Sequence, residues 1–447
     1  MHRRRQLRRR HVSQAAPPTA LRSLSAPTVG YVAVGISAFA LLAAGPRVLG
    51  QDAYSDLAVA WTVSTVFGFG VAVPGEQTVV RGVAGGSAGA VTRHVLIRLL
   101  LATTPILVCA AFALAGVDLL GVEEPIWWLA TAVAAVGWAV LMGPRGSLAG
   151  RGDFTAFGVV LIVEAASRVV LVAGAMVAPR GSGASTWLLA AAVGIPLLVA
   201  AGTAVVLGRR ALVPAQAQDA APSLSLSAAP VPQPVVTHGT AGEQSSLTAL
   251  ALAMQVLLNS APLWLSARPE VSAATAGLYV SVTSYMRIPA LFTGGALAVV
   301  LSRASSMHSD GDRGALRGML AYHLRVIGGL TSALTLLLIL AAPVGLAVLY
   351  GRGTHVGWLV LVVIGVATVL FSLGNLATSA LIGMRRSGAA AAVWVLAAVC
   401  ATAGLAVVPP TLIGASWAVL VGVVVGCVGA AVVLIRGLAP TSQEEPA

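Results

Sequence analysis

The sequence has little charge, few aromatic residues and no lysine. Only 9% of its 447 residues are charged and 5% are aromatic, against 57% that are hydrophobic. Soluble domains carry roughly 25% charged residues, so this composition excludes both a soluble domain and a globule with one anchor. All 27 basic residues are arginine, which with abundant alanine, glycine and valine is typical of GC-rich coding sequence.

Motifs for metal or phosphate chemistry are missing as well. The three cysteines lie inside apolar runs and are predicted to be buried thiols, and the seven histidines are scattered. There is no metal-ligand spacing and no phosphate-binding loop, so we expect no metal, no cofactor and no direct use of ATP. The predicted outside loops are short, which disfavours a polytopic glycosyltransferase, and we expect no enzyme activity.

What the chain does have is a series of long apolar segments, each close to the ~20 residues that a helix needs to cross a bilayer. The sequence predicts an all-α polytopic membrane protein with about 12 transmembrane helices in two six-helix bundles, related by a pseudo-two-fold along the membrane normal. The predicted spans are 27–45, 55–75, 94–116, 126–146, 154–178, 185–208, 247–266, 274–302, 320–342, 357–382, 388–408 and 411–435.

The arginines predict the orientation. If the N-terminus is cytoplasmic, the outside loops hold only Arg47, Arg180, Arg268 and Arg352, and most other arginines fall inside. This positive-inside pattern predicts that both termini are cytoplasmic. The net charge of +12 therefore reflects topology, and we expect no nucleic-acid partner.

Composition divides the chain into five parts. Residues 1–26 are predicted to be a basic, disordered tail held near anionic lipid. A first bundle (27–208) and a second bundle (247–435) flank a flexible cytoplasmic linker at 209–246, rich in Pro, Ala and Ser, and 436–447 form a cytoplasmic tail.

The two halves resemble each other weakly. Residues 147–153 (SLAGRGD) resemble 380–386 (ALIGMRR), and the start of span two resembles the start of span eight. Parallel repeats of this kind place a substrate site between the halves, near the membrane midplane. Chance similarity in Ala/Gly-rich sequence is the alternative.

The polar residues inside the spans are the candidate site residues. Arg287 lies in the middle of span eight, with Tyr279 and Thr283 on roughly the same face and Pro289 two residues later. A mid-membrane arginine costs at least ~2.5–3.5 kcal/mol, so it is expected to face a protein interior or a wet cavity. The alternative is a structural arginine satisfied by backbone carbonyls or by Glu164.

Glu164 and Arg168 lie four residues apart in span five and can pair on one helix face. That pair is either structural or part of the site, and Glu164 could instead pair with Arg287. Interhelical hydrogen bonds are the simpler role for the amides of spans seven and ten. These amides belong to Gln255, Asn259 and Asn375. Asp56 and Glu76 are expected at the outer and inner interfaces.

Four segments carry a family resemblance: 46–58 (PRVLGQDAYSDLA), 148–154 (LAGRGDF), 163–171 (VEAASRVVL) and 276–303. They resemble the polysaccharide-transporter branch of the multidrug/oligosaccharidyl-lipid/polysaccharide exporter superfamily. The resemblance covers residues ~28–435 and implies two six-helix bundles that open alternately to each side of the inner membrane.

The resemblance also implies a substrate, an oligosaccharide linked to polyprenyl pyrophosphate and flipped to the outer leaflet. Guanidinium binds phosphate through a bidentate fork, so arginines are the expected headgroup ligands. The expected cavity residues are Arg287, Arg168, Tyr279, Thr283, Asn259 and Asn375, with Glu164 as a coupling or ion-pair residue. Membrane lipids and a polysaccharide polymerase or glycosyltransferase are the expected partners.

Two other functions remain open. Ion-coupled multidrug exporters of the same superfamily have an acidic residue in the first or seventh span, and both spans here contain no Asp or Glu. The sequence also departs from the flippase pattern, in which an acidic residue shortly follows an Asn in the seventh span. No acidic residue follows Asn259 within that span, so the coupling ion stays open. A non-transporting, flippase-like scaffold that recruits partners through its tail and linker is the third alternative.

Overall fold

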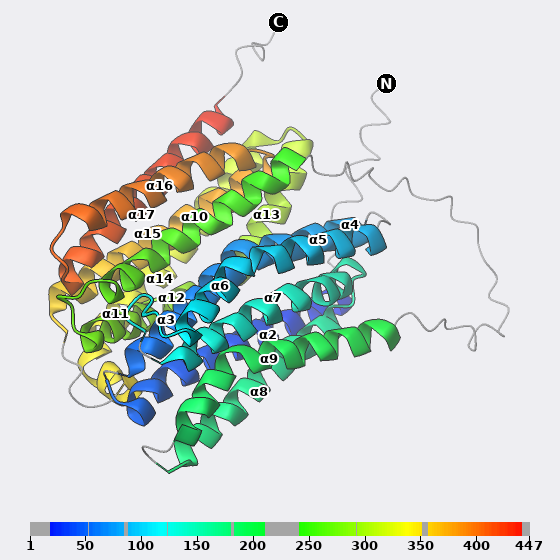
Figure 1. Cartoon of the computed structure of the whole chain (residues 1–447). Helices are drawn as coiled ribbons and strands as arrows, with labels where there is room; N and C mark the ends of the chain where they lie inside the picture. The colour runs from blue at the N-terminus through cyan, green and yellow to red at the C-terminus, as the bar shows by residue number, and fades with distance from the viewer. Residues whose placement is uncertain are drawn as a thin grey trace, which may run out of the picture.

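The computed structural model describes residues 18–51, 53–84, 88–122, 124–179, 183–210, 241–291, 293–350 and 356–439. Within these ranges the chain is helical apart from loops and one β-bridge between Leu119 and Val122. The helices, drawn in Figure 1, are α2 (Pro18–Leu49), α3 (Tyr54–Phe67), the π-helix η2 (Gly68–Ala72), α4 (Val73–Ala84), α5 (Ala88–Ala102), α6 (Thr104–Leu114), α7 (Pro125–Gly150), α8 (Phe154–Val177), α9 (Gly183–Arg210), α10 (Ala241–Ser266), α11 (Ala273–Met286), α12 (Ile288–Leu291), α13 (Gly294–Ser309), α14 (Arg313–Tyr350), α15 (Trp358–Gly383), α16 (Ser387–Val407) and α17 (Leu412–Leu438).

The prediction of an all-α membrane protein is confirmed. Eleven stretches of helix in the described residues are long and apolar enough to cross a bilayer. The chain is thus a multi-pass membrane protein, and a broken crossing through α11, α12 and α13 brings the number of spans to about 12. The predicted linker (209–246) and tail (436–447) lie mostly outside the described residues. Helix α2 begins at Pro18, inside the segment 1–26 that was predicted to be disordered.

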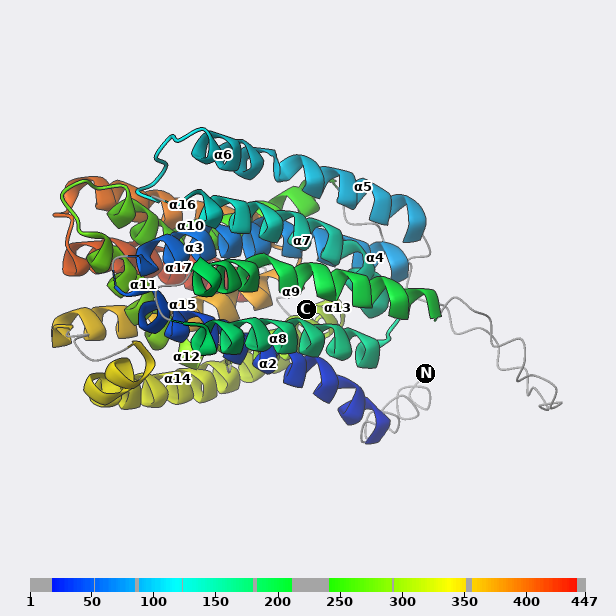
Figure 2. The same cartoon turned by 60° about the horizontal axis from the view of Figure 1, so that its bottom comes forward.

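The helices of each half pack mainly on one another, and the packing of the first half repeats in the second. Helix α2 packs on α8 as α10 packs on α16, and α8 packs on α9 as α16 packs on α17. Likewise α7 contacts α9 as α15 contacts α17, and α4 contacts α7 as α13 contacts α15. Figures 1 and 2 show the first half (blue to green) beside the second (green to red). The same helix order in both halves is the arrangement expected of parallel repeats.

Span eight was predicted as one helix over 274–302, and this prediction was wrong. Helix α11 ends at Met286, α12 covers four residues, and α13 begins at Gly294. Pro289 explains why α11 does not continue, because it cannot donate to the carbonyl of Tyr285. The corresponding span of the first half is interrupted at a similar depth by η2, between α3 and α4.

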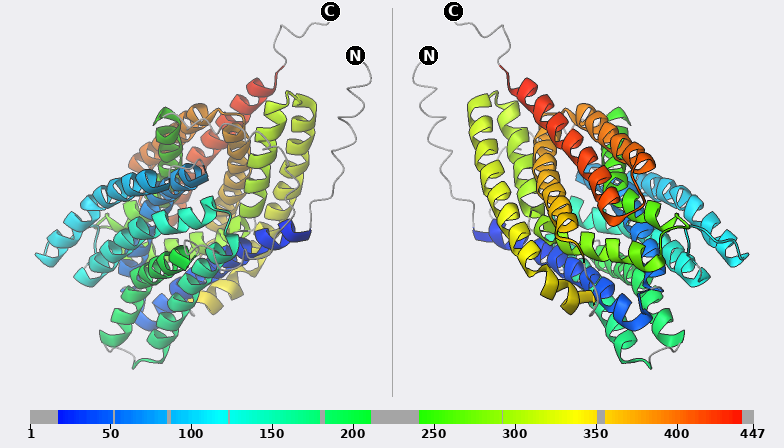
Figure 3. Two further views of the ribbon diagram at one scale, coloured as in Figure 1. Left: turned by 90° about the vertical axis from the view of Figure 1, so that its right-hand side faces the viewer. Right: turned by 90° about the vertical axis from the view of Figure 1, so that its left-hand side faces the viewer.

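Direct contacts join the halves around Tyr54, at the start of α3. Its hydroxyl accepts a hydrogen bond from Ser281 of α11 at 3.2 Å, and its ring lies against Gly277. Nearby, the Gln51 amide donates to the carbonyl of Tyr350 at 3.4 Å. Figure 3 shows the two halves from opposite sides, with α2 and α14 crossing where the halves meet.

Glycine packing inside the second half makes a testable prediction. A Cβ on Gly422 of α17 would lie 2.7 Å from the Ala397 carbonyl oxygen of α16, whereas a Cβ on Gly329 of α14 meets nothing within 4 Å. We expect Gly422→Ala to lower the free energy of unfolding by about 1–3 kcal/mol. Gly329→Ala should be neutral, or stabilising by up to about 1 kcal/mol through helix propensity. Thermal unfolding of the purified protein in detergent measures both, and equal effects would contradict this packing.

Candidate functional site

Arg287 stands at the point where α11 ends. Its backbone N–H donates to the carbonyls of Thr283 (3.0 Å) and Ser284 (3.2 Å), which closes the last turn of the helix. Pro289 then prevents the helix from continuing. The C-terminal end of a helix carries partial negative charge, so this position favours a cation. The local sequence therefore supplies both the break and a favourable place for the guanidinium.

The guanidinium of Arg287 reaches across to α10, where its two partners are neutral. One terminal nitrogen donates to the backbone carbonyl of Leu258, and the other donates to Asn259 Oδ1 at 3.4 Å. The Asn259 amide group is itself held by Gln255, through its carbonyl (2.9 Å) and its side-chain oxygen (3.0 Å). Asn259 thus accepts an interhelical hydrogen bond, while Gln255 orients it from within the same helix. Neither cancels the charge of Arg287.

A cavity of about 230 Å³ opens beside Arg287, inside the second half of the chain. It is enclosed by α10, α11, α12, α15 and α17, and Arg287 is the charged residue among those that line it. The other polar lining groups are hydroxyls, and the remaining lining is apolar. The residues are Leu258, Tyr279, Thr283, Arg287, Ala290, Ile364, Ala367, Thr368, Phe371, Ser416, Val419 and Val423.

The hydroxyls of this cavity keep their oxygens available as acceptors. Thr283 donates to the Tyr279 carbonyl at 2.8 Å, Thr368 to the Ile364 carbonyl at 3.0 Å, and Ser416 to the Leu412 carbonyl at 2.6 Å. The protons of these three hydroxyls are therefore used within their own helices. The donors available to a ligand in the cavity come mainly from Arg287, whose guanidinium has five N–H groups.

Sequence analysis expected Arg287 in a cavity between the halves, together with Arg168. The structure separates them, because the cavity lies within the second half and Arg168 is buried in the first. Arg168 donates to Glu164 Oε1 (3.0 Å), to Ser37 Oγ (3.0 Å) and to the Ala192 carbonyl (3.3 Å). Its guanidinium also lies 5.6 Å from the centre of the Trp61 ring. Glu164 therefore pairs with Arg168 and not with Arg287.

A second buried ion pair was missed. Glu76 is 6% exposed and accepts two hydrogen bonds from Arg145 of α7, at 2.8 Å and 2.6 Å. Asp56 is 5% exposed and accepts from the Glu124 N–H at 3.3 Å. The interfacial depth expected for both acids stays a prediction. Their partners could not be found from the sequence, because each contact joins residues far apart in the chain.

Some of the cavity residues predicted from the sequence lie at this cavity, and others do not. Arg287, Tyr279 and Thr283 line one cavity, and Asn259 touches Arg287 from beside it. Asn375 of α15 is not among the lining residues, and its carbonyl accepts from Ser379 at 3.1 Å. The lining residues that were missed, such as Thr368, Phe371 and Ser416, lie in apolar spans where no sequence pattern distinguishes them from packing residues.

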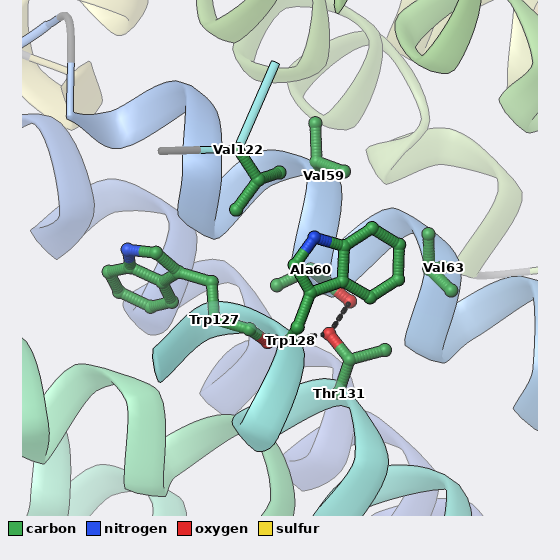
Figure 4. A pocket seen from close by; sticks show the side chains of 7 residues that line it. All are labelled: Val59, Ala60, Val63, Val122, Trp127, Trp128 and Thr131. Carbon is green, nitrogen blue, oxygen red and sulfur yellow. Dashed lines mark hydrogen bonds between the residues drawn. The ribbon is translucent and has the colours of Figure 1, made fainter. Parts of the chain in front are cut away.

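A second, much smaller crevice lies in the first half, between α3 and α7. Figure 4 shows the Trp128 ring beside Val59, Ala60 and Val63, while Trp127 points the other way. The Thr131 hydroxyl lies 2.8 Å from the carbonyl of Trp127 in its own helix and 3.5 Å from that of Ala60. This crevice is too narrow for a water molecule and has no charged lining residue, so it is a packing feature.

No protein-family model and no curated protein matches the sequence. Solved structures do match over nearly the whole chain. An inward-facing multidrug resistance MATE family transporter of the MOP superfamily is 15% identical, with 94% of this chain and 97% of that chain covered and a TM-score of 0.62. An outward-facing structure of the same description gives 14% identity, 93% and 94% coverage and a TM-score of 0.60. A eukaryotic MATE transporter is 15% identical, with 93% of this chain and 95% of that chain covered and a TM-score of 0.64.

These similarities establish the fold, which is that of the MATE transporters. MATE transporters are placed in the MOP superfamily, and this is the superfamily that the sequence resemblance indicated. A shared fold does not show what is transported, so function has to be argued from the site.

The buried pair Glu164–Arg168 generates a prediction about stability. Removing one partner leaves an uncompensated buried charge, so we expect Glu164→Ala to cost about 3–5 kcal/mol of unfolding free energy. Glu270 is an exposed acid in the loop between α10 and α11, and Glu270→Ala should change stability little. Thermal unfolding in detergent measures both variants. If they unfold at the same temperature, the pair contributes nothing.

Proposed function

We propose that this protein is a transporter that flips an oligosaccharide linked to a polyprenyl diphosphate across the cell membrane, by alternating access. One observation carries the choice of an anionic substrate. Arg287 lines a cavity in the second half of the chain, and its recorded side-chain partners are a carbonyl and an amide. The predicted spans of that half contain no Asp or Glu, so they supply no carboxylate to cancel the charge.

The electrostatics favour a phosphate headgroup. A cation in surroundings of low dielectric constant interacts strongly with any nearby anion, because little water screens it. The planar guanidinium can form two parallel hydrogen bonds to a phosphate. The Thr283 and Ser416 oxygens line the same cavity and can accept from sugar hydroxyls. Binding of the headgroup would replace part of the solvation that Arg287 lost on insertion.

The size of the cavity limits what it can hold. A pocket for a drug-sized ligand measures about 300–1,000 Å³, so a volume of about 230 Å³ suits a diphosphate and not an oligosaccharide. In this proposal the diphosphate enters beside Arg287, the sugars occupy the space between the halves in an open conformation, and the polyprenyl chain stays in the bilayer. The buried pairs Glu164–Arg168 and Glu76–Arg145 hold the first half together, and either acid is a candidate proton carrier.

Export of cationic drugs is the second candidate function. It is favoured by the fold neighbours described as multidrug resistance transporters. It is disfavoured by charge, because a cationic drug in this cavity would face Arg287. In the first half, Glu76 and Glu164 already pair with arginines.

A flipping assay tests the proposal. The purified protein in liposomes should move a fluorescent polyprenyl diphosphate between leaflets, and Arg287→Ala should slow this at least about tenfold, since one charge-assisted contact is worth about 1.4 kcal/mol or more. Arg287→Lys should give an intermediate rate, because lysine keeps the charge and loses the fork.

Arg325→Ala is the matched control, because Arg325 is exposed on α14. It should leave the rate unchanged. Full flipping activity in Arg287→Ala would refute the role of the cavity. Transport of a cationic dye, with no movement of the lipid, would instead establish the multidrug alternative.

A further inference from the structure

The carbonyl that binds Arg287 is available because of a proline. In an α-helix the carbonyl of residue 258 accepts from the N–H of residue 262. Residue 262 is Pro262, which has no N–H, and it lies inside α10. The Leu258 carbonyl therefore loses its helical donor at a depth where an unsatisfied polar group is costly. Arg287 of α11 supplies the missing donor.

The first half of the chain contains the same arrangement. Pro196 lies inside α9, and the carbonyl four residues before it belongs to Ala192. That carbonyl accepts from Arg168 Nε at 3.3 Å. Two arginines in different halves, Arg168 buried and Arg287 partly buried, thus donate to carbonyls that lack a helical donor because of a proline. The arrangement is a repeated way of holding a guanidinium inside the protein.

The two cases differ in what happens to the charge. Arg168 also pairs with Glu164 at 3.0 Å, so its charge is cancelled. Arg287 is held by the Leu258 carbonyl and by Asn259, which orient the guanidinium and leave its positive charge in place. A neutral acceptor fixes the side chain, and a carboxylate would compete with an anionic ligand. The carbonyl exposed by Pro262 is suited to an arginine that must bind something else.

We propose that Pro262 is a positioning residue for Arg287, which fixes the guanidinium at the cavity wall by leaving the Leu258 carbonyl free to accept from it. Alanine at this position would restore the helical N–H and draw the carbonyl back toward the helix axis. Its use in substrate binding rests on the proposed function. The contact between Pro262, Leu258 and Arg287 does not, so the two claims can fail separately.

The experiment is a double-mutant cycle on the full-length protein in detergent, with the wild type, Pro262→Ala, Arg287→Ala and the double variant. Arg287→Ala leaves the Leu258 carbonyl without a donor, and Pro262→Ala then supplies one. We therefore expect Pro262→Ala to raise the unfolding temperature more in the Arg287→Ala background than in the wild type. Equal shifts in the two backgrounds would show that Pro262 only bends the helix, and would overturn the proposal.

Binding of inorganic pyrophosphate, measured by calorimetry, is the second readout. Pro262→Ala should weaken binding about tenfold in the wild type and have no effect in the Arg287→Ala background. Pro196→Ala acts on the other arginine, and Pro343→Ala alters an exposed proline of α14; neither should change pyrophosphate affinity. If the wild type binds no pyrophosphate, the proposed substrate class is wrong, and the thermal cycle still decides the role of Pro262.

Discussion

A polar group at hydrocarbon depth has to find its partner within the protein, and this constraint determines how the chain is built. Apolar side chains can face lipid or one another without further requirement, so most of the sequence is free to be Ala, Val, Leu and Gly. Each buried arginine must be surrounded by acceptors. Arg145 and Arg168, which are buried, and Arg287, which is partly buried, are each joined to a neighbouring helix. They fix which helix faces meet.

The two halves satisfy the constraint differently. The first half places acids beside Arg145 and Arg168, so the charges of these two arginines are cancelled. The second half has no acids in its predicted spans and meets Arg287 with a carbonyl and an amide. Two halves with the same helix packing thus differ in how they surround an arginine.

Sequence alone predicted the type and approximate number of the spans, because hydrophobic length is a strong signal in membrane proteins. It also brought Arg287, Tyr279 and Thr283 together, since their spacing puts them on one helix face. It could not place Glu76 against Arg145, which are 69 positions apart, because that contact depends on helix packing. The break after Met286 was missed although Pro289 was evident, since membrane helices often continue through proline.

Helix α14 is longer than the membrane is thick. Its 38 residues correspond to about 57 Å at 1.5 Å per residue, against a hydrocarbon core of about 30 Å. The predicted span 320–342 leaves residues beyond it at both ends of the helix. At the end that carries Arg313 and Arg317, the guanidinium groups donate to the carbonyls of Ala439 and Leu438, at the end of α17. The start of α14 and the end of the last helix are therefore tied together, so neither can shift along its axis without the other.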